Sequence, residues 1–234
     1  MDSTVRIAYA ANRRIGLSCL RKLLAAGVRP VVLLVPEGDN AECTAEMEAL
    51  LPDVPVLRGK AFSLPENLEL LTSLKLDYLL SIHFPLILPK TILATASHGA
   101  LNLHPAYLPW NRGWHTPSWA ILEGTPYGAT LHWIDEGLDT GPIALQKKVE
   151  VHADDTAHVL YQRALAAEGE IFAEAIPQLQ THSLPRVPQS GKGTSHAKAD
   201  LEKMRKLDAS LSPEEKKLRI RALTTNNPGE AAYE

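Results

Sequence analysis

Residues 99–115 read Gly-Ala-Leu-Asn-Leu-His-Pro-Ala-Tyr-Leu-Pro-Trp-Asn-Arg-Gly-Trp-His, and the rest of the chain is organised around them. The apolar run that opens the stretch predicts a strand, which ends at Pro105 because proline cannot donate to a β ladder. Asn102 and His104 are two positions apart, so their side chains share one face of that strand. Open α/β sheets bind ligands at the carboxyl ends of their strands. We therefore expect a polar site where this strand ends.

The residues before this stretch alternate between strand and helix patterns. Predicted strands cover residues 5–10, 31–35, 54–57 and 77–82, and predicted helices cover residues 15–26, 41–51 and 65–74. Alternation with short connections is typical of a doubly wound, mostly parallel α/β sheet of the Rossmann-like kind. No GxGxxG or Walker lysine motif follows the first strand, which argues against a dinucleotide site of the usual type.

The residues after it complete the predicted α/β domain. A helix is expected over 116–123, strands over 128–134 and 141–151, and a long helix from about 153 to 179. Residues 183–193 are rich in Pro and Gly and are expected to form a linker. Leu201, Met204, Leu207 and Leu211 then follow a helical spacing. The sequence thus predicts a catalytic domain over 1–180, followed by a linker and a short, charged, helical C-terminal segment over 181–234.

Composition narrows the class of protein. The chain has 234 residues, of which 45% are hydrophobic and 22% charged, with a formal net charge of −3, so no general affinity for nucleic acid is expected. No membrane-spanning run and no signal-peptide apolar region are found, which predicts a cytoplasmic protein without a membrane partner. Cys19 and Cys43 lack metal-ligand spacing and are expected to be incidental thiols in a reducing compartment. His98, His104 and His115 also lack such spacing, so no metal is expected.

A second polar turn, Asp135-Glu-Gly-Leu-Asp-Thr-Gly-Pro142, supplies the carboxylate of Asp139. An amide, an imidazole and a carboxylate together can receive a reacting carbonyl group. Spacing alone leaves a structural alternative open, because a histidine before a proline at a strand end is often only a capped loop residue.

The combination of these residues resembles the folate-dependent formyltransferases. The resemblance rests on Asn102-Leu-His104-Pro with a following Leu-Pro, on Gly113 and on Asp135-Glu-Gly-Leu-Asp139-Thr-Gly, and it runs from about residue 78 to 151. It implies a Rossmann-like transferase that uses N10-formyltetrahydrofolate as formyl donor, needs no metal and forms a homodimer. Asn102, His104 and Asp139 match the catalytic trio of that family.

The resemblance also implies where the folate binds. In this family the loop that corresponds to residues 83–89 lines the pterin pocket. The expected folate contacts are apolar side chains and one carboxylate of two loops, namely Phe84, Ile87, Leu88, Ile134, Asp135 and Leu138. From the sequence alone, a turn that covers the core is the favoured interpretation of the stiff apolar loop at 83–89.

The loop from Trp110 to His115 concerns the acceptor of the formyl group. Its aromatic side chains can stack on a base or a sugar, and its single arginine can bind phosphate oxygens. It looks most like the corresponding loop of nucleotide-sugar N-formyltransferases, which act on dTDP-, UDP- or GDP-linked 4-amino-4,6-dideoxyhexoses for O-antigen-type surface glycans. Expected substrate contacts from two turns are Asn12, Arg13, Asn111, Arg112, Trp114 and His115. The arginines that follow the first strand are equally compatible with a solvated turn.

Three alternatives remain open at this stage. Methionyl-tRNA is one, although an acidic chain is a poor match to RNA. An amino acid bound to a carrier protein is another, and the separate C-terminal segment argues mildly against it. The third is a protein that binds nucleotide sugar or folate without catalysis, and the intact trio argues against that one.

Overall fold

The computed structural model describes residues 5–234, which are built around a seven-stranded sheet. The strands are β1 (Ile7–Ala11), β2 (Val32–Val35), β3 (Val56–Arg58), β4 (Leu76–Ile82), β5 (Ala96–His104), β7 (Tyr127–Trp133) and β8 (Ile143–Val149). Their order is β3-β2-β1-β4-β5-β7-β8. The first five are parallel, whereas β7 and β8 are antiparallel to their neighbours. The predicted mostly parallel, Rossmann-like sheet is confirmed.

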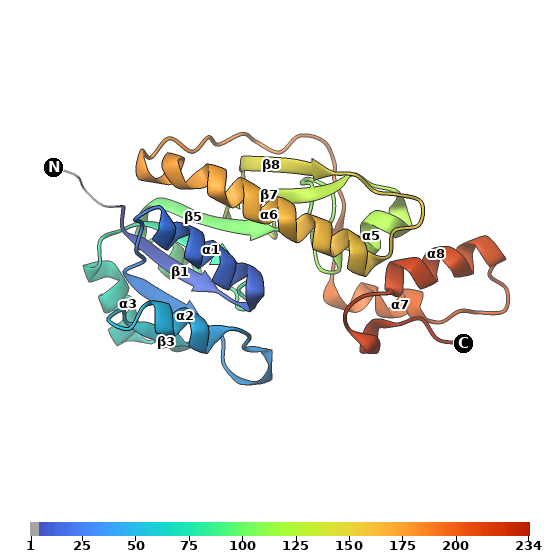
Figure 1. The fold of residues 1–234 in the computed structure, drawn as a ribbon, viewed down its shortest axis with the longest axis horizontal. Coiled ribbons are helices and arrows are strands. Elements are labelled where there is room, and N and C mark those ends of the chain that lie inside the picture. Colours follow the sequence, from blue (N-terminus) through green and yellow to red (C-terminus); the bar gives the residue numbers. More distant parts are fainter. Residues whose placement is uncertain (1–4) are drawn as a thin grey trace.

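Helices cover both faces of this sheet. They are α1 (Arg13–Ala25), α2 (Thr44–Leu50), α3 (Pro65–Ser73), α4 (Lys90–Leu93), α5 (Thr116–Glu123) and α6 (Ala157–Gln180). Figure 1 shows α1 and the long α6 lying side by side over one face. Thr156 begins α6 by accepting a hydrogen bond from the amide of Val159, as a helix N-cap does. Gly27, at a φ of 75°, follows α1 where the sequence predicts the helix to end.

Strand β1 shows how the sequence divides the core between the two faces. Ile7 and Tyr9 pack in the cluster under α1 and α6, and Ala8 and Ala10 pack in the cluster under α3 and α4. All four residues are fully buried, which explains why the strand is continuously apolar rather than alternating. The same alternation places Leu101 of β5 towards α6 and Ala100 towards the other face.

The C-terminal segment consists of short elements that pack on α5. They are β9 (Ser195–His196), α7 (Glu202–Arg205) and α8 (Pro213–Leu223), and β9 pairs with β6 (Arg112–Gly113). Trp119 of α5, Leu201 and Leu223 form a separate small apolar cluster. In Figure 1 these elements lie at one end of the molecule, beyond α5.

One prediction for the end of the chain is wrong. A single helix through Leu201 and Leu211 does not form, because Lys206 is extended, bridges Tyr233 and ends α7. A new helix then starts after Ser212, whose hydroxyl caps it. Residues 183–193 connect α6 to the C-terminal elements, and Val187 within them exchanges backbone hydrogen bonds with Ile143 at the edge of the sheet. The division at residue 180 stays a prediction.

Among residues 5–234, no helix combines the length and the apolar character that crossing a bilayer requires.

Candidate active site

Strand β5 carries two of the predicted catalytic residues to the sheet's carboxyl edge. Asn102 lies opposite His132 of β7, and His104 lies opposite Thr130. The Nδ2 atom of Asn102 is 3.3 Å from Nε2 of His132. His132 is a site residue that the sequence analysis missed, although a buried polar residue in an apolar strand, just before the Asp135–Pro142 turn, was an available signal.

Asp139 reaches these side chains from the turn between β7 and β8. Its backbone has a φ of 53°, a left-handed conformation that aspartate tolerates better than most residues. Its Oδ2 accepts a hydrogen bond of 2.9 Å from the amide of Gly113 and lies 3.7 Å from Nε2 of His104. Its Oδ1 lies 3.3 Å from Nε2 of His132 and 3.5 Å from Nδ2 of Asn102. The structure therefore brings together the three residues that the sequence singled out.

The environment of Asp139 keeps its carboxyl group ionised. Burial alone raises the pKa of Asp139, but the charge of His104 and the hydrogen bond and charge of His132 outweigh burial. The backbone hydrogen bond from Gly113 acts in the same direction. The resulting pKa of Asp139 lies well below its ordinary value, so the site holds a fixed negative charge at neutral pH.

The ring of His104 is buried and oriented by a backbone carbonyl. Its Nε2 lies 3.1 Å from the carbonyl oxygen of Asn111. A carbonyl oxygen only accepts hydrogen bonds, so Nε2 carries the hydrogen and, in the neutral ring, Nδ1 carries the lone pair. A histidine held in one tautomer in this way can accept a proton at Nδ1.

Two of the predicted substrate contacts are buried within the protein. Asn111 is fully buried, and its side chain forms hydrogen bonds with Thr125 and Pro126. Asn12 is 2% exposed and bonds to the backbone of Asn40 and Glu42. Both side chains therefore hold loops in place, and their contact with substrate stays a prediction. Buried amides need hydrogen-bond partners, and loop carbonyls, a backbone amide and the hydroxyl of Thr125 supply them here.

Arg112 is linked to the Asp139 turn through a residue that the sequence did not suggest. Its Nε and Nη2 donate to Oε1 of Gln189, at 3.2 and 2.7 Å. Gln189 in turn donates from Nε2 to the carbonyl oxygens of Asp139 and Gly141, both at 2.8 Å. Gln189 was missed because it lies in the Pro- and Gly-rich stretch that was expected to be a linker. The arginine predicted to bind phosphate thus also fixes the turn that carries the carboxylate.

The remaining predicted acceptor residues have different surroundings. Trp114 is 45% exposed, and the ammonium group of Lys198 lies 5.2 Å above its ring. His115 has its Nδ1 3.7 Å from a carboxylate oxygen of Glu230. Arg13 is half-exposed and lies 3.5 Å from Glu42 at the start of α1. Lys198 therefore lies over the partly exposed ring of Trp114, whereas Arg13 is on a separate turn.

The two loops predicted to hold the folate lie next to each other. Phe84, Leu88 and Ile134 pack against the same core cluster. The ammonium group of Lys90, just after the first loop, lies 2.5 Å from Glu136 of the second. This arrangement brings the two loops together, as a shared pocket requires.

The other members of the predicted folate set point outward or are bonded locally. Ile87 is 92% exposed and Leu138 is 57% exposed. Asp135 accepts hydrogen bonds from Gly137 and Thr140, so its carboxylate closes its own turn. The contact of these residues with folate stays a prediction.

A buried polar group anchors the first of these loops to α6. His83 follows β4 directly and has a φ of 50°. Its Nε2 lies 2.9 and 3.0 Å from the two oxygens of Glu168, a fully buried residue, and the hydroxyl of Tyr161 lies 3.3 Å from Nδ1. Burial and the charge of Glu168 raise the pKa of Tyr161 to about 12. The sequence analysis did not identify this group.

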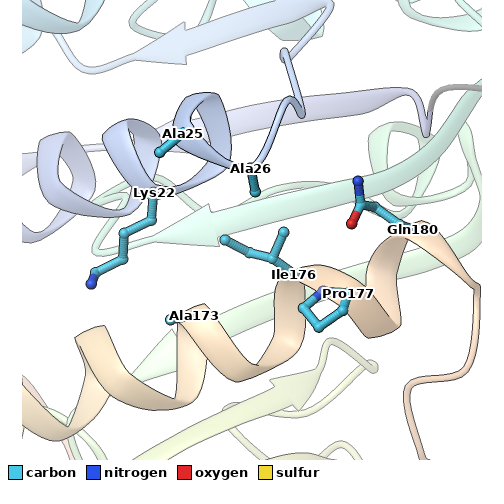
Figure 2. Close-up of a pocket in the computed structure, with 7 residues that line it drawn as sticks. All are labelled: Lys22, Ala25, Ala26, Ala173, Ile176, Pro177 and Gln180. Atoms are coloured by element: carbon cyan, nitrogen blue, oxygen red, sulfur yellow. The ribbon is translucent and has the colours of Figure 1, made fainter.

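A hollow of about 450 Å³ lies between α1 and α6, and Figure 2 shows the side chains that line it. Lys22, Ile176 and Gln180 are among its lining residues, and none of the predicted catalytic or binding residues belongs to it. A second hollow of about 450 Å³ includes Asn40, Pro85 and Leu86, and so adjoins the first folate loop. The first hollow is therefore separate from the candidate active site.

Comparison with known proteins agrees with this geometry. The sequence profile of the family described as formyl transferase matches residues 24–176. The methionyl-tRNA formyltransferase of Myxococcus xanthus is 34% identical over 229 residues, which cover 95% of this chain and 73% of that protein. The methionyl-tRNA formyltransferase of Syntrophus aciditrophicus is 30% identical over 202 residues, and the match covers 82% of this chain and 64% of that protein.

Solved structures show the same fold. A 4-N formyltransferase from Francisella tularensis superposes with a TM-score of 0.80 at 22% identity, over 95% of this chain and 89% of that one. A formyltransferase from Anoxybacillus kamchatkensis, in complex with UDP-4,6-dideoxy-4-formamido-L-AltNAc and tetrahydrofolate, is 30% identical, with a TM-score of 0.57 over 74% of this chain and 87% of that one. The chain belongs to the formyl transferase family, as the resemblance of its sequence predicts.

Proposed function

We propose that this protein transfers the formyl group of N10-formyltetrahydrofolate to the amino group of a nucleotide-linked amino sugar. The observation that carries the proposal is the convergence of Asn102, His104 and Asp139 at the carboxyl edge of the sheet. The complex of the Anoxybacillus kamchatkensis enzyme with tetrahydrofolate and a formamido sugar supports both the donor and the acceptor class.

The first chemical step places negative charge next to Asn102. When the amine attacks the formyl carbon, the carbonyl oxygen becomes an oxyanion. The side-chain amide of Asn102 can donate a hydrogen bond to this oxyanion. A well-aimed donor of this kind contributes about 3 kcal/mol to transition-state stabilisation. The contact with Asp139 fixes the direction in which this amide points.

The second step removes a proton from the attacking nitrogen. His104 accepts it at Nδ1, because Nε2 is committed to the carbonyl of Asn111. The imidazolium that forms is stabilised by the ionised Asp139, whose Oδ2 lies 3.7 Å away. The proton then passes to the folate nitrogen as the bond from that nitrogen to the formyl carbon breaks, which gives tetrahydrofolate and the formamide.

The acceptor surface fits a diphosphate-linked sugar. Lys198 places a cation over the ring of Trp114, and Arg112, two positions earlier in the chain, supplies a second. Cations bind diphosphate oxygens, and an aromatic face stacks with a base or sugar. Such a product belongs to the synthesis of surface glycans such as O-antigen, and we place the enzyme in the cytoplasm as a homodimer.

Methionyl-tRNA is the second candidate acceptor. It is favoured by the 34% identity to the Myxococcus xanthus methionyl-tRNA formyltransferase over 95% of this chain. Against it, the formal net charge of −3 gives no general attraction to RNA.

An acceptor panel separates the two candidates. Purified protein is incubated with N10-formyltetrahydrofolate and either UDP-, dTDP- and GDP-linked amino sugars or charged methionyl-tRNA, and the formylated acceptor is quantified. Formylation of at least one amino sugar, with a kcat/KM well above that for methionyl-tRNA, supports the proposal. Preferential formylation of methionyl-tRNA transfers the assignment to the second candidate.

A further inference from the structure

We propose that Asp77, His98 and His182 bind a divalent transition-metal cation of the Zn²⁺ class at the edge of the sheet opposite the candidate active site. Asp77 is near the start of β4, His98 is near the start of β5, and His182 follows the C-terminus of α6. Asn102 and His104 lie at the other end of β5. The proposed site is therefore separate from the catalytic trio.

The three side chains are already close enough to share an ion. One ligand atom from each lies within 4.8 Å of those of the other two. Nδ1 of His98 is 3.8 Å from Oδ1 of Asp77, which is too long for a hydrogen bond. Two ligands of a tetrahedral zinc ion, with bonds of about 2.1 Å, are about 3.4 Å apart. These side chains are partly exposed, and their rotation can reach that separation.

At least one of the two imidazole rings has to turn before both can hold one ion, because an imidazole binds a metal in the plane of its ring. The rings of His98 and His182 stack with their centres 4.0 Å apart and an angle of 11° between their planes. Two imidazoles and one carboxylate form a donor set that suits Zn²⁺ and similar cations, whereas Mg²⁺ and Ca²⁺ prefer oxygen ligands alone. Three protein ligands leave one position of a tetrahedral ion for water.

Neighbouring groups hold each ligand in place. The backbone amide of Arg6 donates to Oδ2 of Asp77 at 2.7 Å, which leaves Oδ1 facing His98. The hydroxyl of Tyr78 lies 3.2 Å from Nδ1 of His182. The guanidinium of Arg186 is engaged by the carbonyl of His98 and by the ring of Trp133. Outer contacts of this kind orient metal ligands and tune their affinity.

A bound cation would join three separate segments of the chain. It would tie the end of α6 to β4 and β5, just before the stretch that carries Gln189 to the Asp139 turn. The expected consequence is stabilisation of the fold, since an ion that binds only the folded state shifts the unfolding equilibrium. The metal takes no part in formyl transfer.

The test uses the full-length protein, stripped with a chelator and titrated with Zn²⁺ alone by calorimetry at about pH 7.5, where imidazole is mostly neutral. We expect one ion per chain with micromolar affinity and a rise in Tm of several degrees on adding Zn²⁺. His98→Ala and His182→Ala should each weaken binding by at least about tenfold and abolish the Tm rise. Asp77→Asn should also weaken binding, and each variant should fold without metal because these side chains lie near the surface.

Two matched variants serve as controls. His152→Ala removes a histidine that also lies 3.8 Å from a carboxylate, that of Glu150, but lacks a third ligand, and it should bind Zn²⁺ like the wild type. His104→Asn should do the same. The proposal is overturned if Zn²⁺ shows no saturable binding, if binding survives both His98→Ala and His182→Ala, or if His104→Asn abolishes it.

Discussion

The two loop surfaces next to the trio differ in how they are held. On the acceptor surface, the polar side chains of Asn111, Arg112 and Gln189 are all engaged within the protein. On the donor surface, which consists of the two loops expected to bind the folate, the apolar side chains of Ile87 and Leu138 are exposed. From this difference we expect the acceptor surface to hold catalytic groups in position and the donor surface to be apolar area that the folate covers. Substitutions on the first should therefore change kcat, and those on the second should change KM for the folate.

The largest effect is expected where the acceptor surface meets the chemistry. His104→Asn removes the group that accepts the proton, and should lower kcat by about a thousandfold or more. Binding of the acceptor, measured by calorimetry, should stay within about tenfold of the wild type because other residues hold it. If binding falls as far as activity, His104 has a structural role and the assignment is wrong.

The second effect tests whether the hydrogen bonds of Arg112 and Gln189 hold the acceptor surface in position. Arg112→Ala and Gln189→Ala should each lower kcat/KM for the acceptor by about tenfold to a hundredfold, because each breaks the link from Arg112 to the Asp139 turn. The two losses should be far from additive in the double variant, since both act through one chain of hydrogen bonds.

The way this loss divides between the kinetic constants separates two roles of Arg112. A change in kcat reports on the position of Asp139, and a change in the acceptor KM reports on contact with phosphate. Arg112→Lys should recover little of either, because an ammonium cannot reproduce the planar fork that holds Gln189. Strictly additive effects of Arg112→Ala and Gln189→Ala would show that the observed link has no functional role.

The third effect concerns the anchor of the donor surface. Glu168→Gln removes the buried charge next to His83 and should lower the free energy of unfolding by about 1–3 kcal/mol in urea titrations. Because His83 begins the loop that carries Phe84 and Leu88, the KM for the folate should rise while the acceptor KM stays unchanged. Glu170→Gln, on the exposed side of the same helix, is the matched control and should change neither.

The fourth effect is a pH dependence that follows from the lowered pKa of Asp139. A carboxyl group whose pKa is lower in the folded than in the unfolded protein stabilises the fold above its unfolded pKa of about 4 and loses that contribution as pH falls below it. The difference in unfolding free energy between wild type and Asp139→Asn should thus shrink as the pH is lowered below about 4. A difference that stays unchanged in acid solution would mean that the folded protein does not lower the pKa of Asp139.

The smallest effect tests the open donor surface directly. Ile87→Ser should raise the KM for the folate a few-fold and leave kcat and stability unchanged, since the side chain is 92% exposed without ligand and is expected to be covered only in the complex. Val151→Ser is the control, because this other exposed branched side chain lies outside the site. An unchanged folate KM in Ile87→Ser would remove Ile87 from the proposed pocket.

The sequence predicted those features that depend on local pattern. The alternation of apolar runs gave the order of strands and helices, and the spacing of Asn102 and His104 correctly placed them on one face. Contacts between residues far apart in the chain could not be predicted from such patterns. Arg112 and Gln189 form a hydrogen bond although they are 77 positions apart in the sequence. His83 and Glu168 are 85 positions apart and also form a hydrogen bond. Nothing in the local sequence of either pair distinguishes them from solvated residues.

The most direct test of formyl transfer from the folate to the amino sugar follows the formyl group itself. Wild-type protein is mixed with N10-formyltetrahydrofolate and an amino sugar that the acceptor panel identifies, and tetrahydrofolate and formylated sugar are quantified in the same samples. The account predicts that the two products appear together in equal amounts and that neither forms at a measurable rate with His104→Asn. Release of tetrahydrofolate without a formylated amine, or transfer that persists in His104→Asn, would contradict it.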